Sequence, residues 1–385
     1  MTTGRDVTTG RDVTLRVAQW ATGAVGSHAL GVIAAKPGLE LVAVHVSSPA
    51  KVGRDAAELT GPLAAPMFGG QPSGVRATAD REELLAARPD VVVHAADADT
   101  RMEAAVDDLE WLLAHGVDVV SSGPVVLQYP WGTAPAEWVE RLERACARGG
   151  STLHVNGIDP GFANDVLPLA LSSLSSRVDE VRCYEISDYS TYDNATMVSG
   201  FFGFGTPMDR APVIAAPGVL SSGWGPAVRQ LAAALGVELD PELREVVERL
   251  PAERDTRTVC CEIPAGTQAA LRFEVVGTVD GVPRVAVEHV LRAHTDLAPE
   301  WPAPLNGGPA SFRVRITGEP RLDLELTHTS SDGDHGASGM TTTAARLVNA
   351  VPAVHAAAPG IVTAADLPQV TGVGLVAGGG GHTPE

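Results

Sequence analysis

The chain has 385 residues, of which 44% are hydrophobic and 19% are charged, and its formal net charge is −19. A chain of this length exceeds one compact core and suits two domains, and this composition excludes a wholly disordered protein. The negative charge argues against binding to nucleic acid or to an anionic membrane, because both need clustered Lys and Arg.

The N-terminal residues and the apolar runs predict a soluble, cytoplasmic protein. No apolar run reaches the roughly 20 residues that cross a bilayer. Met1–Arg16 lacks the apolar core of a signal peptide. Residues 2–7 are repeated as residues 8–13, and we expect residues 1–14 to form a disordered extension.

The cysteines and lysines exclude several kinds of chemistry. No Cys-x-x-Cys spacing occurs among the four cysteines, Cys146, Cys183, Cys260 and Cys261. Because adjacent residues on one strand point to opposite faces, we expect Cys260 and Cys261 to form neither a metal pair nor a disulfide. The two lysines are Lys36 and Lys51, and neither has the buried setting that imine or pyridoxal phosphate chemistry requires.

The first part of the chain alternates strands with helices. We expect strands at 15–20, 39–46, 91–94, 117–120 and 152–155. We expect helices from Val25 to the Pro37-Gly38 stop and at 82–87, 103–114 and 136–147. This rhythm is typical of βαβ units, so the sequence predicts an α/β Rossmann domain with a doubly wound parallel sheet over residues 15–158.

After residue 158 the pattern changes. A helix at 163–174 precedes a strand at 180–186, and further strands are expected at 270–279, 284–293, 311–317 and 321–329. We interpret these strands as an antiparallel meander in an α+β domain with a largely antiparallel sheet, which binds substrate and dimerises, over residues 159–338. Residues 341–357 return to helix with a kink expected at Pro352, and residues 376–385 read as a flexible tail.

The turn after the first strand resembles a dinucleotide-binding loop. It reads Ala21-Thr22-Gly23-Ala24-Val25-Gly26, with alanine in the first glycine position. Gly23 lets the backbone approach a pyrophosphate, the following helix start supplies N–H groups, and Gly26 permits close packing of helix and strand. A glycine-rich turn can also merely connect two elements. Its place between a strand and a helix favours a cofactor site at Thr22, Gly23, Ala24, Val25 and Gly26.

The end of the second strand predicts which cofactor binds. An acid about 20 residues past the glycines would bind the ribose 2′-hydroxyl of NAD. This chain instead has Ser47, Ser48 and Lys51 there, without a carboxylate. These groups suit a 2′-phosphate, so the sequence predicts NADP(H) in preference to NAD(H). The alternative is a solvated turn with an incidental lysine.

The carboxyl ends of the later strands are expected to line the cofactor crevice. Ala95, Ala96 and Asp97 follow one strand, and Ser121 and Ser122 follow the next, which places all five near the nicotinamide ribose. Asp97 also suits a polar entry to the next helix.

The crossover into the second domain, residues 156–165, is rich in polar residues. Asn164 or Asp165 suits the cap of the next helix. This leaves Asn156 and Asp159 for roles in the cleft.

Two further polar segments allow more than one interpretation. The run 185–193, Glu-Ile-Ser-Asp-Tyr-Ser-Thr-Tyr-Asp, suits either a pocket wall or a surface loop. Asp332, Asp334 and His335 lie in a glycine-rich loop without a second histidine at ligand spacing, so we expect no metal site. His94 is more typical of a packed histidine at a strand end.

Five sequence runs carry a family resemblance. They are Trp20–Gly26, Lys51–Asp55, Tyr129–Trp131, Asn156–Phe162 and Ala345–Ala350. With them, residues 15–375 resemble the dihydrodipicolinate-reductase-like superfamily, and more closely the group of 2,4-diaminopentanoate dehydrogenase and the native amine dehydrogenases. The resemblance implies hydride transfer between a nicotinamide and a C=N or C–N carbon, often in a homodimer. It also implies a C-terminal helix, within 339–375, that packs back on the Rossmann domain.

One loop departs from that group. Its amine dehydrogenases have a glutamate just before the Tyr-Pro-Trp, whereas residues 121–128 here contain no acid. The ammonia-handling step is therefore open. An NADP(H)-dependent ketone or alcohol oxidoreductase, or a non-catalytic NADP(H) sensor, is an alternative to an imine or amine dehydrogenase with a small-molecule substrate. The candidate catalytic residues are Tyr129, Asp159 and Asp188.

Overall fold

The computed structural model describes residues 14–98, 100–331 and 333–376. The chain divides into two compact units, one of residues 1–157 with 340–385 and one of residues 158–339. Almost all of the predicted extension, residues 1–14, and of the predicted tail, residues 376–385, lies outside the described residues. Asp332 also lies outside them. In the described part of the chain, no helix is long and apolar enough to cross a membrane.

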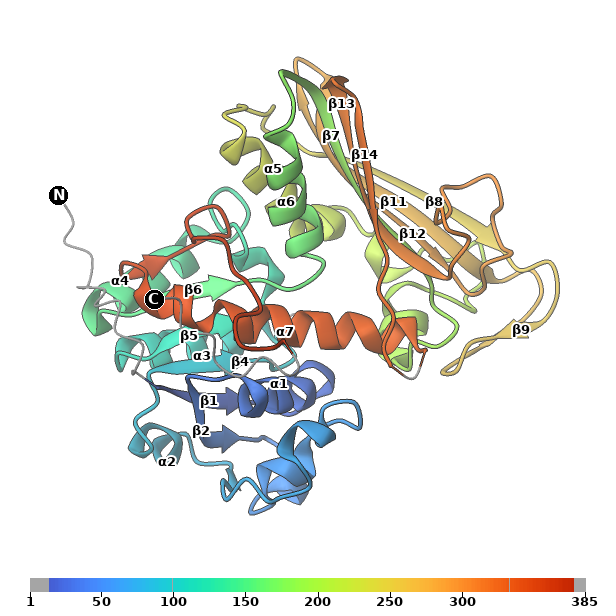
Figure 1. Cartoon of the computed structure of the whole chain (residues 1–385). Helices are drawn as coiled ribbons and strands as arrows, with labels where there is room; N and C mark the ends of the chain where they lie inside the picture. Colours follow the sequence, from blue (N-terminus) through green and yellow to red (C-terminus); the bar gives the residue numbers. More distant parts are fainter. Residues whose placement is uncertain (1–13, 99, 332, 377–385) are drawn as a thin grey trace. The chain divides into compact units, whose positions relative to one another are not determined.

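The first unit is built on a seven-stranded parallel sheet (Figure 1). In spatial order its strands are β15 (Gly360–Ile361), β6 (Thr152–Val155), β5 (Asp118–Ser121), β4 (Val91–His94), β1 (Leu15–Trp20), β2 (Leu39–His45) and β3 (Ala77–Thr78). The strand order reverses between β1 and β4. Open parallel sheets bind their ligands at such a point, beyond the carboxyl ends of the strands.

Helices cover both faces of this sheet, as the doubly wound prediction requires. They are α1 (Ala24–Ala35), α2 (Arg81–Ala86), α3 (Met102–Ala114), α4 (Ala136–Gly149) and the part of α7 (His335–Ala356) that belongs to this unit. Consecutive residues of a strand point to opposite faces. Val91 and Val93 of β4 accordingly join the buried cluster of α1 and α7, and Val92 joins that of α3 and α4.

The second unit contains a six-stranded, largely antiparallel sheet. In spatial order its strands are β14 (Leu322–Leu326), β13 (Ala310–Glu319), β7 (Arg177–Asp188), β12 (Val282–Arg292), β11 (Gln268–Val279) and β8 (Arg244–Pro251). The predicted meander is wrong. β7, the first of these strands in the chain, lies between β12 and β13 and pairs in parallel with β12. Hairpin signals are local, so they do not report this long-range pairing.

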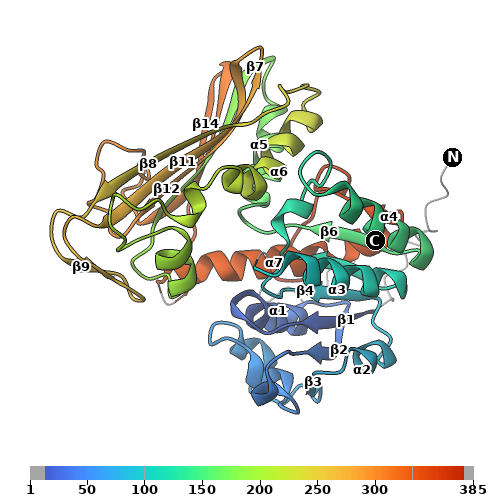
Figure 2. The same ribbon diagram turned by 180° about the vertical axis from the view of Figure 1, so that it is seen from behind.

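Two helices lie along one face of the second sheet (Figure 2). They are α5 (Val166–Ser172) and α6 (Val219–Ala234). α6 and β8 were not predicted. α6 contains Gly223, Gly225 and Pro226, which disfavour helix, but its buried residues, such as Val228 and Leu231, pack into the main apolar cluster of this unit.

A two-stranded hairpin, β9 (Thr256–Arg257) and β10 (Glu262–Ile263), completes the second unit. The expectation that Cys260 and Cys261 lie on one strand is wrong, because both lie in the turn of this hairpin. Both are free thiols. Their sulfur atoms lie 3.5 and 3.2 Å from the same hydroxyl oxygen, that of Thr258.

Candidate functional site

The turn between β1 and α1 is open on the side of Gly23. A Cβ atom added at Gly23 would meet no atom within 4 Å, and no side chain caps α1. The first N–H groups of a helix have no partner within the helix, and such an end binds phosphate oxygens. A Cβ atom at Gly26 would lie 2.2 Å from the carbonyl oxygen of Ala21, so the close packing predicted at Gly26 is present.

Ala21, which stands in the first glycine position of the fingerprint, adopts a backbone conformation typical of glycine. Its φ of 68° lies in the left-handed region, which glycine adopts more readily. The buried side chain of Gln19 holds this conformation. Its Nε2 donates hydrogen bonds to the carbonyl oxygens of Trp20 at 3.2 Å and Ala21 at 2.9 Å.

The Lys51 ammonium group lies against the glycine turn. Its Nζ donates to the carbonyl oxygen of Thr22 at 2.7 Å and to Thr22 Oγ1 at 3.1 Å. Ser47 is exposed and Ser48 is half-buried. The segment from β2 to Lys51 therefore brings a positive charge, and no carboxylate, to the residue that precedes Gly23.

The carboxyl ends of β4 and β5 are joined by a buried hydrogen bond. His94 Nδ1 lies 2.9 Å from Ser121 Oγ. Burial lowers the pKa of His94 to about 3, so the ring is neutral, as expected for a packed histidine. Beside this pair, Ala95 is buried, Ala96 and Ser122 are half-buried, and Asp97 is exposed. Asp97 accepts a hydrogen bond from Thr100 at 2.9 Å.

Asn156, after β6, is held by the C-terminal helix. Its Oδ1 accepts a hydrogen bond from Arg346 Nε of α7 at 3.0 Å. Both residues belong to the motifs that carry the family resemblance.

Tyr129 is the only titratable side chain in the segment 121–129. It belongs to the first unit, is half-buried, and has its ring edge-on to Trp131 with 5.2 Å between the ring centroids. The segment 121–128 before this tyrosine thus contains no Asp, Glu, His, Lys or Arg.

In the second unit, three ionisable side chains form a buried row. His289 Nε2 lies 3.5 Å from Asp159 Oδ1, and His289 Nδ1 lies 3.4 Å from Glu185 Oε2. We call Asp159, His289 and Glu185 the carboxylate–histidine relay. Glu185 Oε1 also accepts a hydrogen bond from the Tyr189 hydroxyl at 2.9 Å. The exposed fractions of the three side chains are 3%, 3% and 16%.

The fold brings these three side chains together from separate segments. Glu185 and His289 are register partners on the parallel strands β7 and β12, so they point to the same face. Asp159 follows the crossover from the first unit, and Asn164 donates to its Oδ1 at 2.7 Å. Phe273 stacks on the His289 ring at 4.7 Å, and Trp224 meets it edge-on at 4.9 Å.

The relay holds a proton more strongly than its members would in water. Burial acts to lower the pKa of His289, but Asp159 and Glu185 outweigh it and the pKa is raised. The pKa of Glu185 is also raised, chiefly because burial disfavours its charge. An imidazole between two carboxyl groups can therefore keep a proton and pass it to either side.

The relay is not arranged as a metal centre. Its three ligand atoms lie within 4.8 Å of one another, which a metal ion requires. Each ring nitrogen of His289, however, faces a different carboxylate. We interpret the arrangement as a proton relay, in which the imidazole lies between two carboxylates at ion-pair distance.

Asp188 is the last residue of β7 and is not part of the relay. Its Oδ1 accepts from the backbone N–H of Ser190 at 2.7 Å, and its carbonyl oxygen accepts from His335 Nε2 at 2.7 Å. In the described part of the chain, no hydrogen bond or ion pair joins Asp188 to the relay. Asp334 Oδ1 accepts from the backbone N–H of Gly336 at 2.8 Å.

Sequence reasoning selected Asp159 but missed His289 and Glu185 as its partners. A signal was present in β12, where Glu288 and His289 interrupt an apolar run. Adjacent strand residues point to opposite faces, so two buried faces each receive one ionisable side chain. Both are in fact buried, with 1% and 2% exposed.

Comparisons with known proteins identify the family. Residues 162–375 match the 2,4-diaminopentanoate dehydrogenase C-terminal domain. An amine dehydrogenase of Streptomyces virginiae is 44% identical over 357 residues, which are 92% of this chain and 96% of that protein. The 2,4-diaminopentanoate dehydrogenase of Acetoanaerobium sticklandii is 24% identical over 281 residues, 72% of this chain and 74% of that protein.

A solved structure agrees in fold. The amine dehydrogenase of Mycobacterium smegmatis matches with a TM-score of 0.72 at 22% identity, over 94% of this chain and 98% of that one. The family match covers more than half of the chain, and the first relative is close along nearly its whole length. The chain is therefore an oxidoreductase and belongs to the family of 2,4-diaminopentanoate dehydrogenase and the amine dehydrogenases.

Proposed function

We propose that this enzyme transfers a hydride between NADP(H), used in preference to NAD(H), and the nitrogen-bearing carbon of a small amine or imine. Two relatives are named for the oxidation of amines. The observation that carries the proposal beyond the family is the relay of Asp159, His289 and Glu185, because amine oxidation requires a group that exchanges protons.

The glycine turn suits the pyrophosphate of a dinucleotide. The open space at Gly23 and the uncapped start of α1 support binding by Thr22, Gly23, Ala24, Val25 and Gly26. Lys51, with Ser47 and Ser48, would bind the 2′-phosphate. The position of Lys51 Nζ against Thr22 supports this assignment. Near the nicotinamide ribose we assign Ala95, Ala96, Asp97, Ser121, Ser122 and Asn156.

The bound nicotinamide would supply or accept the hydride at its C4 atom. An amine nitrogen must lose a proton as its carbon loses a hydride, and an imine nitrogen must gain one. General acid–base catalysis of such a transfer contributes about 10²–10⁴-fold in rate. We assign it to Asp159, with His289 and Glu185 holding the proton in reserve. Tyr129 is the candidate acid–base residue from the first unit. We assign no acid–base role to Asp188, because its carboxylate accepts a hydrogen bond from the backbone N–H of Ser190.

The neutral loop at 121–128 favours preformed imines over free ammonia as the nitrogen source. It also favours the second candidate function, reduction of a ketone or oxidation of an alcohol with the same cofactor. A cytoplasmic homodimer stays a prediction from sequence.

The proposal is tested by incubating the purified full chain with NADP⁺ and a panel of small primary amines and secondary alcohols. Amine-dependent formation of reduced cofactor, with Asp159→Asn slowed by about 10²-fold or more, is the expected result. Turnover with alcohols but with no amine would support the second candidate. An Asp159→Asn variant as fast as the unchanged enzyme would remove the relay from the chemistry.

A further inference from the structure

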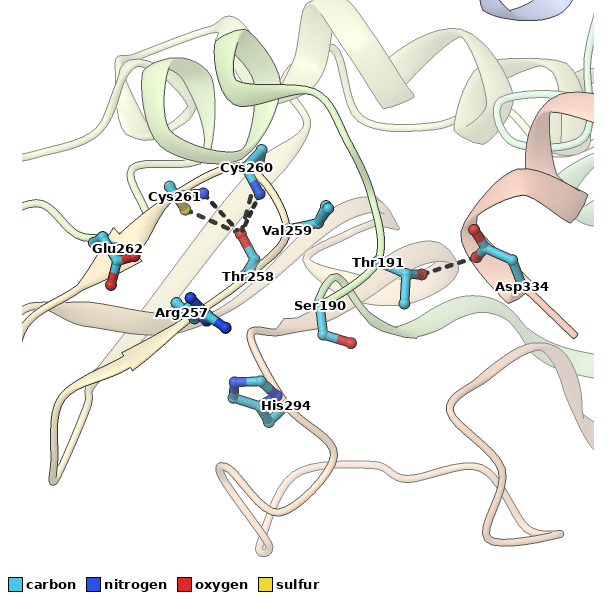
Figure 3. A pocket seen from close by; sticks show the side chains of 10 residues that line it. All are labelled: Ser190, Thr191, Arg257, Thr258, Val259, Cys260, Cys261, Glu262, His294 and Asp334. Carbon is cyan, nitrogen blue, oxygen red and sulfur yellow. Dashed lines mark hydrogen bonds between the residues drawn. The ribbon is translucent and has the colours of Figure 1, made fainter. Parts of the chain in front are cut away.

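The second unit contains a cavity that the proposed chemistry does not use. Its volume is about 850 Å³, and its walls are the loop after β7, the β9–β10 hairpin and the segment after β12. Ser190, Arg257 and His294, one from each of these segments, line it. In Figure 3 their side chains surround the same space.

These three side chains are without a hydrogen-bond or ion-pair partner in the part of the chain that the structure describes. Over residues 14–98, 100–331 and 333–376, no hydrogen bond or ion pair engages the Arg257 guanidinium, the His294 ring or the Ser190 hydroxyl. Arg257 is exposed and Ser190 and His294 are half-buried, so all three side chains can reach a ligand that enters from solvent. Glu262 is the register partner of Arg257 in the hairpin, yet the two form no ion pair.

Other polar groups of the cavity are already engaged. Asp334 Oδ1 accepts hydrogen bonds from Thr191 at 2.9 Å and from the backbone N–H of Gly336, at the start of α7, at 2.8 Å. Thr258 Oγ1 lies against the thiols of Cys260 and Cys261. The groups left to meet a ligand are therefore the three donors and Glu262.

We propose that this cavity binds the carboxylate group of a small organic anion. Arg257 offers the planar pair of N–H groups that matches the two oxygens of a carboxylate, and His294 and Ser190 add donors from the facing walls. The volume exceeds that of a carboxylate alone and lies in the range of small-molecule sites. The rest of the ligand would lie against Val259 and the two thiols.

Two kinds of ligand carry a carboxylate that fits this site. One is the far end of an amine substrate that carries a carboxylate, because Ser190 directly follows Tyr189, whose hydroxyl contacts Glu185 of the relay. The other is a separate carboxylate that acts as an effector. The first source rests on the proposed function, whereas the site itself does not.

The test is calorimetric titration of the full chain, without cofactor, with succinate and separately with inorganic phosphate. We expect saturable binding of succinate that Arg257→Gln weakens by roughly tenfold or more, as the loss of charge-assisted hydrogen bonds implies. Arg254→Gln is the matched control. Arg254 lies just before the same hairpin, its side chain is 83% exposed, and it pairs with Asp296 at 3.3 Å, so binding should be unchanged.

Three results would overturn the proposal. They are no saturable binding of succinate by the unchanged chain, equal binding by Arg257→Gln when its melting temperature is normal, or Arg257-dependent binding of phosphate alone. His294→Asn, which should weaken binding by a smaller factor, serves if Arg257→Gln does not fold.

A kinetic arm separates the two sources. Succinate that raises KM for an amine without changing kcat indicates that the substrate's own carboxylate occupies the site. Succinate that changes kcat indicates an effector. Binding of succinate by a chain that turns over no amine would refute the proposed function and leave this site standing.

Discussion

Lys51→Gln should reduce the preference for NADPH over NADH by a factor that the structure allows us to work out. A hydrogen bond from an ammonium to a phosphate contributes about 1.5–3 kcal/mol, and a neutral one about 0.5–1.5 kcal/mol. Glutamine keeps a neutral donor and loses the charge. The difference, roughly 1–1.5 kcal/mol, corresponds to an about five- to thirteenfold loss in affinity for NADPH.

Glutamine is a sharper replacement than alanine because Lys51 has a second role. Its Nζ donates to both the carbonyl oxygen and Oγ1 of Thr22, and Thr22 precedes the glycine that both cofactors require. Lys51→Ala would leave those two acceptors without their donor and loosen the turn. We therefore expect Lys51→Ala to weaken NADH and NADPH together, and Lys51→Gln to weaken chiefly NADPH.

The assay is fluorescence titration of each variant with NADPH and with NADH at fixed ionic strength. Lys36→Gln is the matched control, since Lys36 is the other lysine and its Nζ donates to Asn349 Oδ1 at 2.8 Å and to the Val373 carbonyl oxygen at 3.2 Å. Equal affinity for the two cofactors in the unchanged enzyme would refute the reasoning. An equal loss of affinity for NADPH and for NADH in Lys51→Gln would also refute it.

Three further predictions follow from the glycine turn, the relay and the neutral loop. Gly23→Asp should abolish NADPH binding, because a carboxylate at this position repels the pyrophosphate. It should not lower the melting temperature, because a Cβ atom at residue 23 has open space around it. Unchanged affinity for NADPH in the same titration would contradict this prediction. His289→Gln should lower the free energy of unfolding by about 1–3 kcal/mol near pH 6. Because the pKa of His289 is raised in the folded protein, this contribution to stability is complete below the ordinary histidine pKa of about 6.5. It is lost as the pH rises through the raised pKa, so urea unfolding at increasing pH should show a shrinking difference between the variant and the unchanged enzyme. A difference that stays constant with pH would argue against a charged His289. NADPH oxidation with ketones should gain little from added ammonium, whereas cyclic imines should be reduced readily; rapid turnover that depends strictly on ammonium would mean that Asp159 replaces the missing loop acid.

The periodicity of apolar residues predicted the helices and strands that are determined by neighbouring residues in the sequence. The β4 run Val91–His94, buried throughout, and the helices around it follow from periodicity alone, and so does the parallel sheet. α6 was missed because Gly223, Gly225 and Pro226 lower its helix propensity, and tertiary burial decides its structure instead. The position of β7 was missed because pairing with β12 joins segments far apart in the chain.

The same division applies to the candidate site. The glycine turn is contained within six consecutive residues, Ala21–Gly26, so a motif suffices to find it. The relay is made by a loop residue, Asp159, and by the register between β7 and β12 that pairs Glu185 with His289. No spacing rule in the sequence specifies that register, and only the apolar surroundings of His289 signal its burial.

β12 offers a comparison that separates a structural ion network from a chemical one. Glu288 and His289 are adjacent, and both are buried on opposite faces of one sheet. Glu288 is fully paired, with Arg272 Nε and Arg182 Nη1 each at 2.8 Å from one of its oxygens. His289 lies at 3.4 and 3.5 Å from its carboxylates, longer than an ordinary hydrogen bond.

Replacing a buried ionic group by apolar residues of similar volume is often neutral or stabilising. A relay whose contacts are this long is therefore poorly explained by stability, since Glu288 demonstrates the geometry that stability favours in the same strand. Proton transfer takes place over about 2.6–3.2 Å, and the contacts of catalytic groups often shorten to that range when substrate binds. The acid–base role that we propose for the relay therefore requires the contacts of His289 to shorten in the substrate complex. This difference in geometry between Glu288 and His289 agrees with the acid–base role that we propose for the relay.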